Sequence, residues 1–111
     1  MLEVGAPERS GESVSIPLRG SLVGLDAARL RNGLAKHYVD DGVAVIVLDA
    51  RGLAFVDEDG VGALLRLRAE ATVKGKQLWL RDPRGQVRDK LALINVLGMF
   101  VPSDEEAGEE P

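Results

Sequence analysis

The feature that most constrains the fold is an uninterrupted apolar run at residues 43–48, Val-Ala-Val-Ile-Val-Leu. Its β-branched residues favour a strand, and the lack of a polar residue at every second position is typical of a central strand covered on both faces, as in mainly parallel sheets. The run is far shorter than the roughly 20 apolar residues that a helix needs to cross a bilayer. We therefore expect a soluble protein, with no membrane insertion.

Strand-like and helix-like segments alternate along the rest of the chain. Residues 13–18 alternate polar and apolar side chains, whereas residues 61–73 place apolar side chains at helical spacing. Alternation of this kind predicts a sheet with substantial parallel pairing. With their caps included, the expected strands cover residues 13–18, 43–48, 77–80 and 99–101, and the expected helices cover residues 26–39, 61–73 and 82–98. The fold class is therefore α/β, a mixed sheet of about four strands with three or more helices packed against it.

Five single residues make specific predictions about these elements. Pro17 cannot donate a ladder hydrogen bond, which favours an edge strand or the end of a strand. Asp26 and Asp82 are each placed to cap a helix, and Asp82 precedes a proline, which is favoured at the first helical position. Trp79, the only tryptophan, is expected in the core. His37, the only histidine, is expected at the surface or at the terminus of its helix.

The segment at residues 47–65 combines a strand end, a turn and an acidic loop that opens a helix. The strand ends in Asp49, the chain turns at Gly52 and passes Phe55, and Asp57-Glu-Asp-Gly60 precedes the helical pattern. One of the three carboxylates is expected to cap the helix, where a negative charge is worth roughly 0.3–1 kcal/mol. Three in succession exceed what a cap needs, which favours an additional role in binding a partner. The spacing of a calcium loop is absent, so no metal site is predicted.

This segment resembles the core motif of the STAS domains, and most closely that of the bacterial anti-sigma factor antagonists. In that family, a strand ending in Asp-Leu leads through a Phe-x-Asp-Ser-Ser-Gly loop into a helix. Residues 18–22, Leu-Arg-Gly-Ser-Leu, are also similar to the Gly-x-Leu-Asp turn of the family. The resemblance covers residues 13–101 and implies that they form a STAS domain. It leaves residues 1–12 as a flexible or extended lead-in and residues 102–111 as an acidic disordered tail.

Two positions depart from the family pattern. Asp59 stands where the family has the serine that is phosphorylated, and Val23 stands where the first turn usually has an aspartate. In the family, the unmodified antagonist binds an anti-sigma factor, often of the kinase type, and phosphorylation of the serine blocks this partner's approach. A phosphate adds a charge of about −1.5 to −2, whereas Asp59 has a smaller and permanent charge. Asp59 either holds the protein in a state like the phosphorylated one or belongs to an interface adapted to a permanent carboxylate.

The resemblance implies a protein-interaction module of bacterial signalling that is not switched by phosphorylation at this loop. The partner is expected at residues 20–25 and 57–61, with Ser21 as the alternative site of modification. The candidate partner-binding residues are Ser21, Leu22, Val23, Asp57, Glu58, Asp59, Gly60 and Val61. The alternative function is a constitutive STAS subunit of a signalling scaffold or of an envelope lipid-transport complex, which the loss of the phosphorylatable serine favours.

Composition and charge argue against several other classes of protein. The chain has no cysteine, which excludes thiolate chemistry and fits a reducing, cytoplasmic compartment. Residues 103–111 carry five carboxylates, so the net charge of −4 leaves about +1 for the remainder, and no basic arm offers a nucleic-acid site. No nucleophile motif, paired base or phosphate loop is present, so neither an enzyme nor a cofactor is expected. The sequence leaves a homodimer open.

Overall fold

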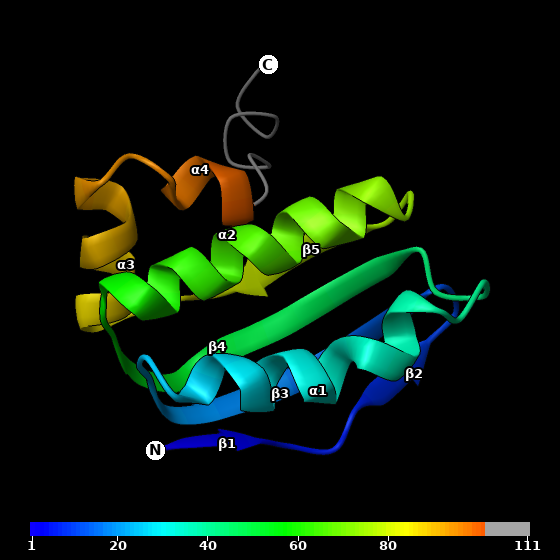
Figure 1. The fold of residues 1–111 in the computed structure, drawn as a ribbon, viewed down its shortest axis with the longest axis horizontal. Helices are drawn as coiled ribbons and strands as arrows, with labels where there is room; N and C mark the ends of the chain where they lie inside the picture. Colours follow the sequence, from blue (N-terminus) through cyan, green and yellow to red (C-terminus); the bar gives the residue numbers. More distant parts are fainter. Residues whose placement is uncertain (102–111) are drawn as a thin grey trace.

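The computed structural model of the protein describes residues 1–101, and the expected acidic tail at residues 102–111 lies outside the described residues. The strands are β1 Leu2–Val4, β2 Glu8–Ser10, β3 Ser13–Leu22, β4 Val45–Val56 and β5 Gln77–Arg81, and the helices are α1 Asp26–Tyr38, α2 Glu58–Val73, α3 Gly85–Leu93 and α4 Leu97–Phe100. The strands form one sheet in the order β1-β3-β4-β5, with β2 also paired to β3 (Figure 1). β1 and β2 run antiparallel to β3, whereas β3, β4 and β5 are parallel. The predicted α/β class with a mixed sheet is confirmed.

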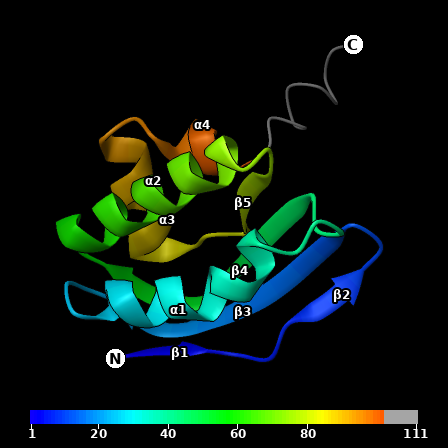
Figure 2. The ribbon, with the colours of Figure 1, turned by 45° about the vertical axis from the view of Figure 1, so that its right-hand side comes forward.

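The helices cover one face of this sheet (Figures 1 and 2). Alternate residues of β3 point toward them, because successive side chains of a strand lie on opposite faces, and Val14, Ile16 and Leu18 are buried. The same core includes Ile46 and Leu48 of β4, Leu78 and Leu80 of β5, Leu30 and Leu34 of α1, Leu64 and Leu67 of α2, Val87 and Leu91 of α3 and Phe100 of α4. One continuous core thus joins all four helices to the sheet.

The opposite face of the sheet is not covered by any helix of residues 1–101 (Figure 2). Val45 and Val47 lie half-buried on it, and Val47 has Ser15 and Trp79 as its cross-strand neighbours. The prediction that the apolar run is covered on both faces is therefore wrong, and so is the prediction that Trp79 lies in the core. Neighbouring side chains on the same face of a sheet shield one another, so these valines are half-buried without a second layer.

Residues 1–12, expected as a flexible or extended lead-in, contain β1 and β2. Both strands pair with β3, so Pro17 lies inside the sheet and away from the strand ends, contrary to the prediction. β1 pairs with residues 18–20 and β2 with residues 13–15, which leaves Pro17 opposite the break between them. Its carbonyl accepts a hydrogen bond from the Gly5 N–H at 2.8 Å, and the N–H that proline lacks is not needed there.

Asp26 and Asp82, which were each predicted to cap a helix, do not do so. Asp26 is the first residue of α1, and its carboxylate accepts a hydrogen bond from the Val23 N–H at 3.1 Å, outside the helix. Asp82 has a positive φ of 54° and binds the Arg84 guanidinium at 2.6 Å, and α3 begins only at Gly85. Aspartate is one of the few residues that enters the left-handed region, so the chain turns at Asp82 before the helix starts.

The C-terminal part has two helices where a long helix and a strand were predicted. α3 ends at Leu93 rather than at Gly98, and α4 takes the place of the strand expected at residues 99–101. Between them, Asn95 has a positive φ of 65°. A left-handed asparagine ends a helix because the chain must change direction there. This reversal places Phe100 in the core, where it is fully buried.

The end of α1 buries polar side chains. His37 lies in the last turn, as predicted, but it is only 7% exposed, and its Nε2 has no hydrogen-bond partner among the described residues. Tyr38 donates its hydroxyl to the carbonyl of Leu67 at 2.8 Å, and burial raises the pKa of Tyr38. Tyr38 thereby ties α1 to α2.

Candidate partner-binding site

The carboxyl ends of β3 and β4 meet at one edge of the sheet because the two strands are parallel. Their last residues, Leu22 and Val56, are neighbours in the register. The turn at residues 23–25 leads from β3 into α1, and Asp57 leads from β4 into α2. The structure thus brings together residues 21–25 and 57–61, which we call the rim (Figure 1).

Asp57 holds the two loops of the rim together. Its Oδ1 accepts a hydrogen bond from the Gly60 N–H at 2.7 Å, which makes Asp57 the N-cap of α2. Its Oδ2 accepts one from the Gly24 N–H at 3.4 Å, and its own N–H donates to the Leu22 carbonyl at 3.3 Å. Of the three consecutive carboxylates, Asp57 is therefore the one that caps the helix, and both of its oxygens are engaged.

Three of the predicted partner-binding residues lie beneath the rim rather than on its surface. Leu22, Gly60 and Val61 are all buried. A Cβ atom on Gly60 would overlap the carbonyl oxygen of Leu22 and would lie 2.7 Å from Cγ2 of Val56. The first turn of α2 is therefore in close contact with the backbone of β3, and these three residues position the rim.

The turn before α1 is held by a carboxylate that the sequence did not assign to the site. Asp26 is buried, and it accepts hydrogen bonds from the N–H groups of Val23 at 3.1 Å and of Leu2 at 3.4 Å. Val23 itself is half-buried. Asp26 therefore fixes the turn against β1, and the Val23 side chain is a minor part of the exposed surface.

Ser21 lies where the rim meets β1. Its Oγ accepts a hydrogen bond from the amino group of Met1 at 2.9 Å, and its N–H donates to the Met1 carbonyl at 3.1 Å. The hydroxyl that was expected as an alternative site of modification is therefore already engaged within the chain.

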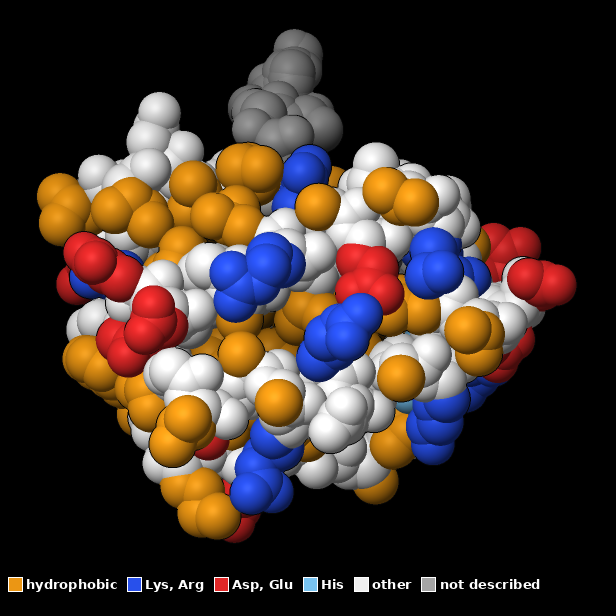
Figure 3. Space-filling view, viewed as in Figure 1, with side chains coloured by type: hydrophobic (Ala, Val, Ile, Leu, Met, Phe, Trp, Pro, Cys, Tyr) orange, Lys and Arg blue, Asp and Glu red, His pale blue; other side chains and the backbone are white. Residues whose placement is uncertain are grey.

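Two of the predicted partner-binding residues, Glu58 and Asp59, have exposed side chains. They occupy the first two positions of α2, where the unpaired N–H groups of the helix favour negative charge. Glu58 lies 3.9 Å from Lys90 Nζ with its side chain 88% exposed, and Asp59 has no ion-pair partner among residues 1–101. Figure 3 shows acidic side chains together at the end of the molecule where α2 begins.

An exposed leucine stands beside this acidic pair. Leu25 is 96% exposed, and it lines a shallow hollow of about 820 Å³ together with Asp59 and Arg29. Phe55, near the end of β4, is also exposed. Periodicity gave no signal for Leu25, because the residue belongs to neither a strand pattern nor a helix pattern. The only feature of the sequence that could have indicated Leu25 is its place directly before the predicted start of the helix at Asp26.

Gln86 closes the free side of β4 at the rim, and the sequence gave no indication of this role. β5 pairs with β4 only as far as Asp49, so the last residues of β4 have no strand beside them there. The Gln86 amide occupies part of the gap. Its Oε1 accepts a hydrogen bond from the Val56 N–H and its Nε2 donates to the Val56 carbonyl, both at 2.9 Å. α3 is thereby tied to the strand that leads into the rim.

The exposed groups of the rim suit recognition of another molecule. They are two carboxylates and a leucine, and the hydroxyl of Ser21 is held by Met1. Nucleophilic catalysis needs an activated nucleophile next to a base, and the geometry of the rim brings no such pair together. Within residues 1–101, no three His, Asp or Glu side chains are grouped so that they could hold a metal ion.

The sequence profile of the family described as Mlab, STAS domain, matches residues 6–102. The chain therefore belongs to the STAS domain family. Its fold is similar to that of the anti-sigma factor antagonist SpoIIAA in its unphosphorylated form, with a TM-score of 0.72 and 22% identity over 98% of this chain and 94% of that chain. The NMR structure of the protein TM1081 gives a TM-score of 0.71 and 16% identity over 93% of this chain and 85% of that one. The predicted STAS fold is confirmed.

The same fold also occurs inside larger proteins. The murine anion transporter Slc26a9 in its inward-facing state gives a TM-score of 0.69 and 23% identity, over 78% of this chain and 14% of the transporter. The chain likewise spans only 20% of the structure of Mglu. None of the curated proteins compared with the chain matches it. Among the described residues, no helix combines the length and the apolar character needed to span a membrane.

Proposed function

We propose that the chain is a non-catalytic, cytoplasmic protein-interaction module of bacterial signalling that binds an anti-sigma factor of the kinase type through the rim. Membership of the STAS family and the likeness to SpoIIAA support this proposal. The observation that carries it is the pairing of an exposed carboxylate with an exposed leucine. Asp59 has no ion-pair partner among residues 1–101 and shares a hollow with Leu25, whereas Asp57 is fully used in holding the loop.

The chemistry of these groups defines the partner surface that fits them. Burying an exposed leucine side chain stabilises a complex by roughly 1.5–3 kcal/mol. A partner surface that binds Leu25 should therefore have an apolar pocket. The partner should also have Lys or Arg side chains beside that pocket, opposite Asp59 and Glu58. Opposite charges raise the association rate of the two proteins and fix their relative orientation. Leu22, Gly60 and Val61 contribute by holding the first turn of α2 against β3.

Control by phosphorylation is not part of the proposed function of this loop. Asp59 stands where the family has its phosphorylatable serine, and residues 57–60 contain no hydroxyl that a serine kinase could phosphorylate. Incubation with the partner kinase and ATP should therefore leave residues 57–60 without phosphate. Ser21 is the alternative acceptor, and its modification would require release of the Met1 amino group from the Ser21 hydroxyl.

The proposal is tested by affinity capture from the lysate of the source cell, followed by mass spectrometry. The baits are the wild-type chain, Asp59→Ser, Leu25→Ala and the control Asp41→Ser. Asp41 is an exposed carboxylate that follows the far end of α1. We expect the wild type and Asp41→Ser to retain an anti-sigma-type ATPase and Leu25→Ala to lose it.

The Asp59→Ser bait separates the two roles left open for Asp59. Capture of the ATPase by this variant alone would contradict binding by the wild-type chain and would show that Asp59 holds the protein in a state like the phosphorylated one. Equal capture by wild type and Asp59→Ser would show that the acidic loop is part of a working interface. Capture of an ATPase by none of the baits, including Asp59→Ser, would contradict the proposal.

A second candidate function is that of a constitutive STAS subunit in a signalling scaffold or an envelope lipid-transport complex. The occurrence of the same fold as 14% of the Slc26a9 chain, a fixed part of a larger protein, favours this candidate. A constitutive subunit co-purifies in fixed stoichiometry with scaffold or membrane-complex proteins, whereas the module proposed above co-purifies with an anti-sigma-type ATPase. The mass of the purified chain in solution, measured in the same preparations, tests the homodimer.

A further inference from the structure

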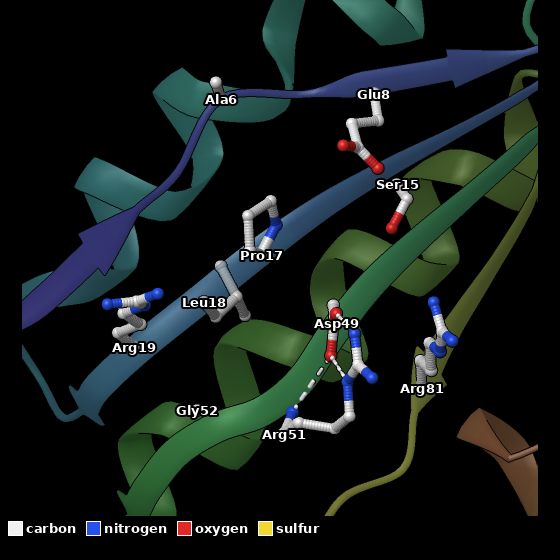
Figure 4. Close-up of a pocket in the computed structure, with 10 residues that line it drawn as sticks. All are labelled: Ala6, Glu8, Ser15, Pro17, Leu18, Arg19, Asp49, Arg51, Gly52 and Arg81. Atoms are coloured by element: carbon white, nitrogen blue, oxygen red, sulfur yellow. Dashed lines mark hydrogen bonds and ion pairs between the residues drawn. The ribbon is translucent and has the colours of Figure 1, made fainter.

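The open face of the sheet carries a groove that lies apart from the rim (Figure 4). The groove has a volume of about 640 Å³ and crosses β3, β4 and β5. Each of these strands contributes one arginine to it, namely Arg19, Arg51 and Arg81. Adjacent strands lie about 4.8 Å apart, so the three side chains form a row across the sheet instead of converging on one point. Such a row fits an extended chain with several carboxylates better than it fits one small anion.

The arginines of this row are available to an acidic ligand. Arg19 and Arg81 have no ion-pair partner among residues 1–101. Arg51 is fixed by the buried Asp49, whose Oδ1 accepts from Nε at 3.0 Å and whose Oδ2 accepts from one terminal nitrogen at 2.7 Å. A guanidinium has five N–H donors, so this pair leaves donors on Arg51 that can bind a further acceptor. Two acidic residues, Asp49 and Glu8, also line the groove.

Trp79 lies on the same face, two residues before Arg81 in β5. It is half-buried, it neighbours Val47 across the strand pair, and its indole N–H donates to Oε1 of Gln77 at 3.2 Å. Because Trp79 is the only tryptophan of the chain, its fluorescence reports on this face of the sheet alone.

We propose that the acidic segment at residues 102–111 of this same chain docks along the arginine row. The segment carries five carboxylates on Asp104, Glu105, Glu106, Glu109 and Glu110. It follows α4, which packs against β5, the edge strand that carries Trp79 and Arg81. Ten extended residues reach roughly 33 Å. β3 lies only two strand spacings beyond β5, about 10 Å, so the segment can span the whole row.

Tethering makes this contact effective although each ion pair is weak. An exposed ion pair contributes about 0–1 kcal/mol. A short tether, however, holds the segment at an effective concentration on the order of 1 mM, so a contact with a dissociation constant near that value is about half populated. The docked segment covers the arginine row and excludes other acidic chains from it, and it leaves the rim at the carboxyl ends of β3 and β4 uncovered.

The test is acrylamide quenching of Trp79 fluorescence in the full-length chain. The comparison variant carries the substitutions Asp104→Asn, Glu105→Gln, Glu106→Gln, Glu109→Gln and Glu110→Gln. At low salt we expect the quenching constant of this amide variant to be up to about twofold higher than that of the wild type, since a half-populated contact protects the indole about half of the time. The difference should vanish near 1 M salt, where the Debye length is about 3 Å.

Single arginine variants locate the contact. Arg81→Gln should remove the protection in the wild-type chain and should add nothing in the amide variant. Arg66→Gln, which changes an exposed arginine of α2 on the helical side, should leave the quenching constant unchanged. Urea denaturation of each variant checks that the fold is retained.

Three outcomes would overturn the proposal. Equal quenching constants for the wild type and the amide variant would show that the segment does not reach Trp79. A difference that persists near 1 M salt would contradict pairing of charges. A difference that grows with protein concentration would assign the segment to the groove of a second copy.

Discussion

The carboxylate of Asp57 and the backbone N–H of Gly60 are joined by a hydrogen bond of 2.7 Å across the first turn of α2. This bond turns Asp57 back into the protein, while Glu58 and Asp59 face solvent. Three consecutive carboxylates thus fall into two groups. One of them stabilises the start of the helix, and the other two are presented on the surface.

Replacing Asp57 by alanine should lower the free energy of unfolding by about 1–2 kcal/mol, because the N–H of Gly60 loses its cap. Asp59→Ala is the matched control and should change stability by no more than about 0.5 kcal/mol, since Asp59 lies on the surface. Urea denaturation followed by circular dichroism measures both values. Equal losses for the two variants would show that Asp57 is not the residue that holds the loop.

Two glycines of α2 should respond in opposite directions to the same substitution. Gly60→Ala forces a Cβ atom against the Leu22 carbonyl and should destabilise the protein by roughly 1–3 kcal/mol. In Gly62→Ala the nearest atom is the flexible end of Arg66 at 3.4 Å, and the gain in helix propensity should stabilise by about 0.5–1 kcal/mol. Thermal unfolding of both variants gives the comparison. A Gly60→Ala variant as stable as the wild type would contradict the packing described for the first turn.

Stability should fall as the pH drops below about 6.5 because of His37. Burial lowers the pKa of His37 from its usual 6.5, Lys36 and Arg9 add to this effect, and Asp40 opposes it. The folded state therefore binds the proton less readily than the unfolded state. The stabilising contribution is complete above pH 6.5 and is lost as the pH falls through the lower pKa of the folded state.

The urea midpoints of the wild type and of His37→Gln, measured at about pH 7.5 and about pH 5.5, test this pH dependence. The wild-type midpoint should decrease between the two conditions, and the decrease should be smaller in the variant, which cannot take up the proton. A parallel decrease in both chains would assign the pH dependence to the carboxylates instead.

Lys76 should be important for stability although it is a charged residue. It is buried, and its Nζ donates to the carbonyls of Asp40 at 2.8 Å and of Val43 at 2.6 Å. Lys76→Met keeps most of the side-chain volume but leaves these carbonyls without their donor, at a cost of about 1–3 kcal/mol. Lys74→Met, at an exposed position two residues earlier, should be nearly neutral in the same thermal unfolding experiment.

Most of the fold could be predicted from the sequence because it depends on local patterns. The alternation of strand and helix periods predicted β3, β4, β5, α1 and α2, and Gly75 ends α2 with a positive φ of 74°, as a glycine stop does. The errors arise where distant residues decide the outcome. The apolar run predicted full burial of Val47. Its burial, however, depends on its neighbour Trp79 and on which face of the sheet the helices cover.

The C-terminal errors have a different physical cause. Asn95 and Asp82 both adopt positive φ, which sequence patterns assign mainly to glycine. The chain therefore turned at these residues where a helix and a cap were expected, and Phe100 entered the core from α4.

The candidate site could be predicted only in part. The resemblance pointed to the acidic loop, and the parallel pairing of β3 and β4 brings that loop beside the first turn. It did not separate Asp57, which is bound within the chain, from Asp59, which is exposed, because that difference rests on hydrogen-bond geometry. Leu25 was not singled out, because a single exposed leucine is common on protein surfaces.

The Gln86 side chain stands where a neighbouring strand would be, so the N–H of Val56 is bound by a side chain instead of a backbone. A side chain can rotate away while the sheet stays intact, whereas a strand cannot leave without wider unfolding. The Val56 amide proton should therefore exchange with solvent through local openings, faster than the amides at the middle of β4, which have strands on both sides. A partner seated on the rim would restrain those openings. Hydrogen exchange at this single amide can thus record occupancy of the site without any label on the partner.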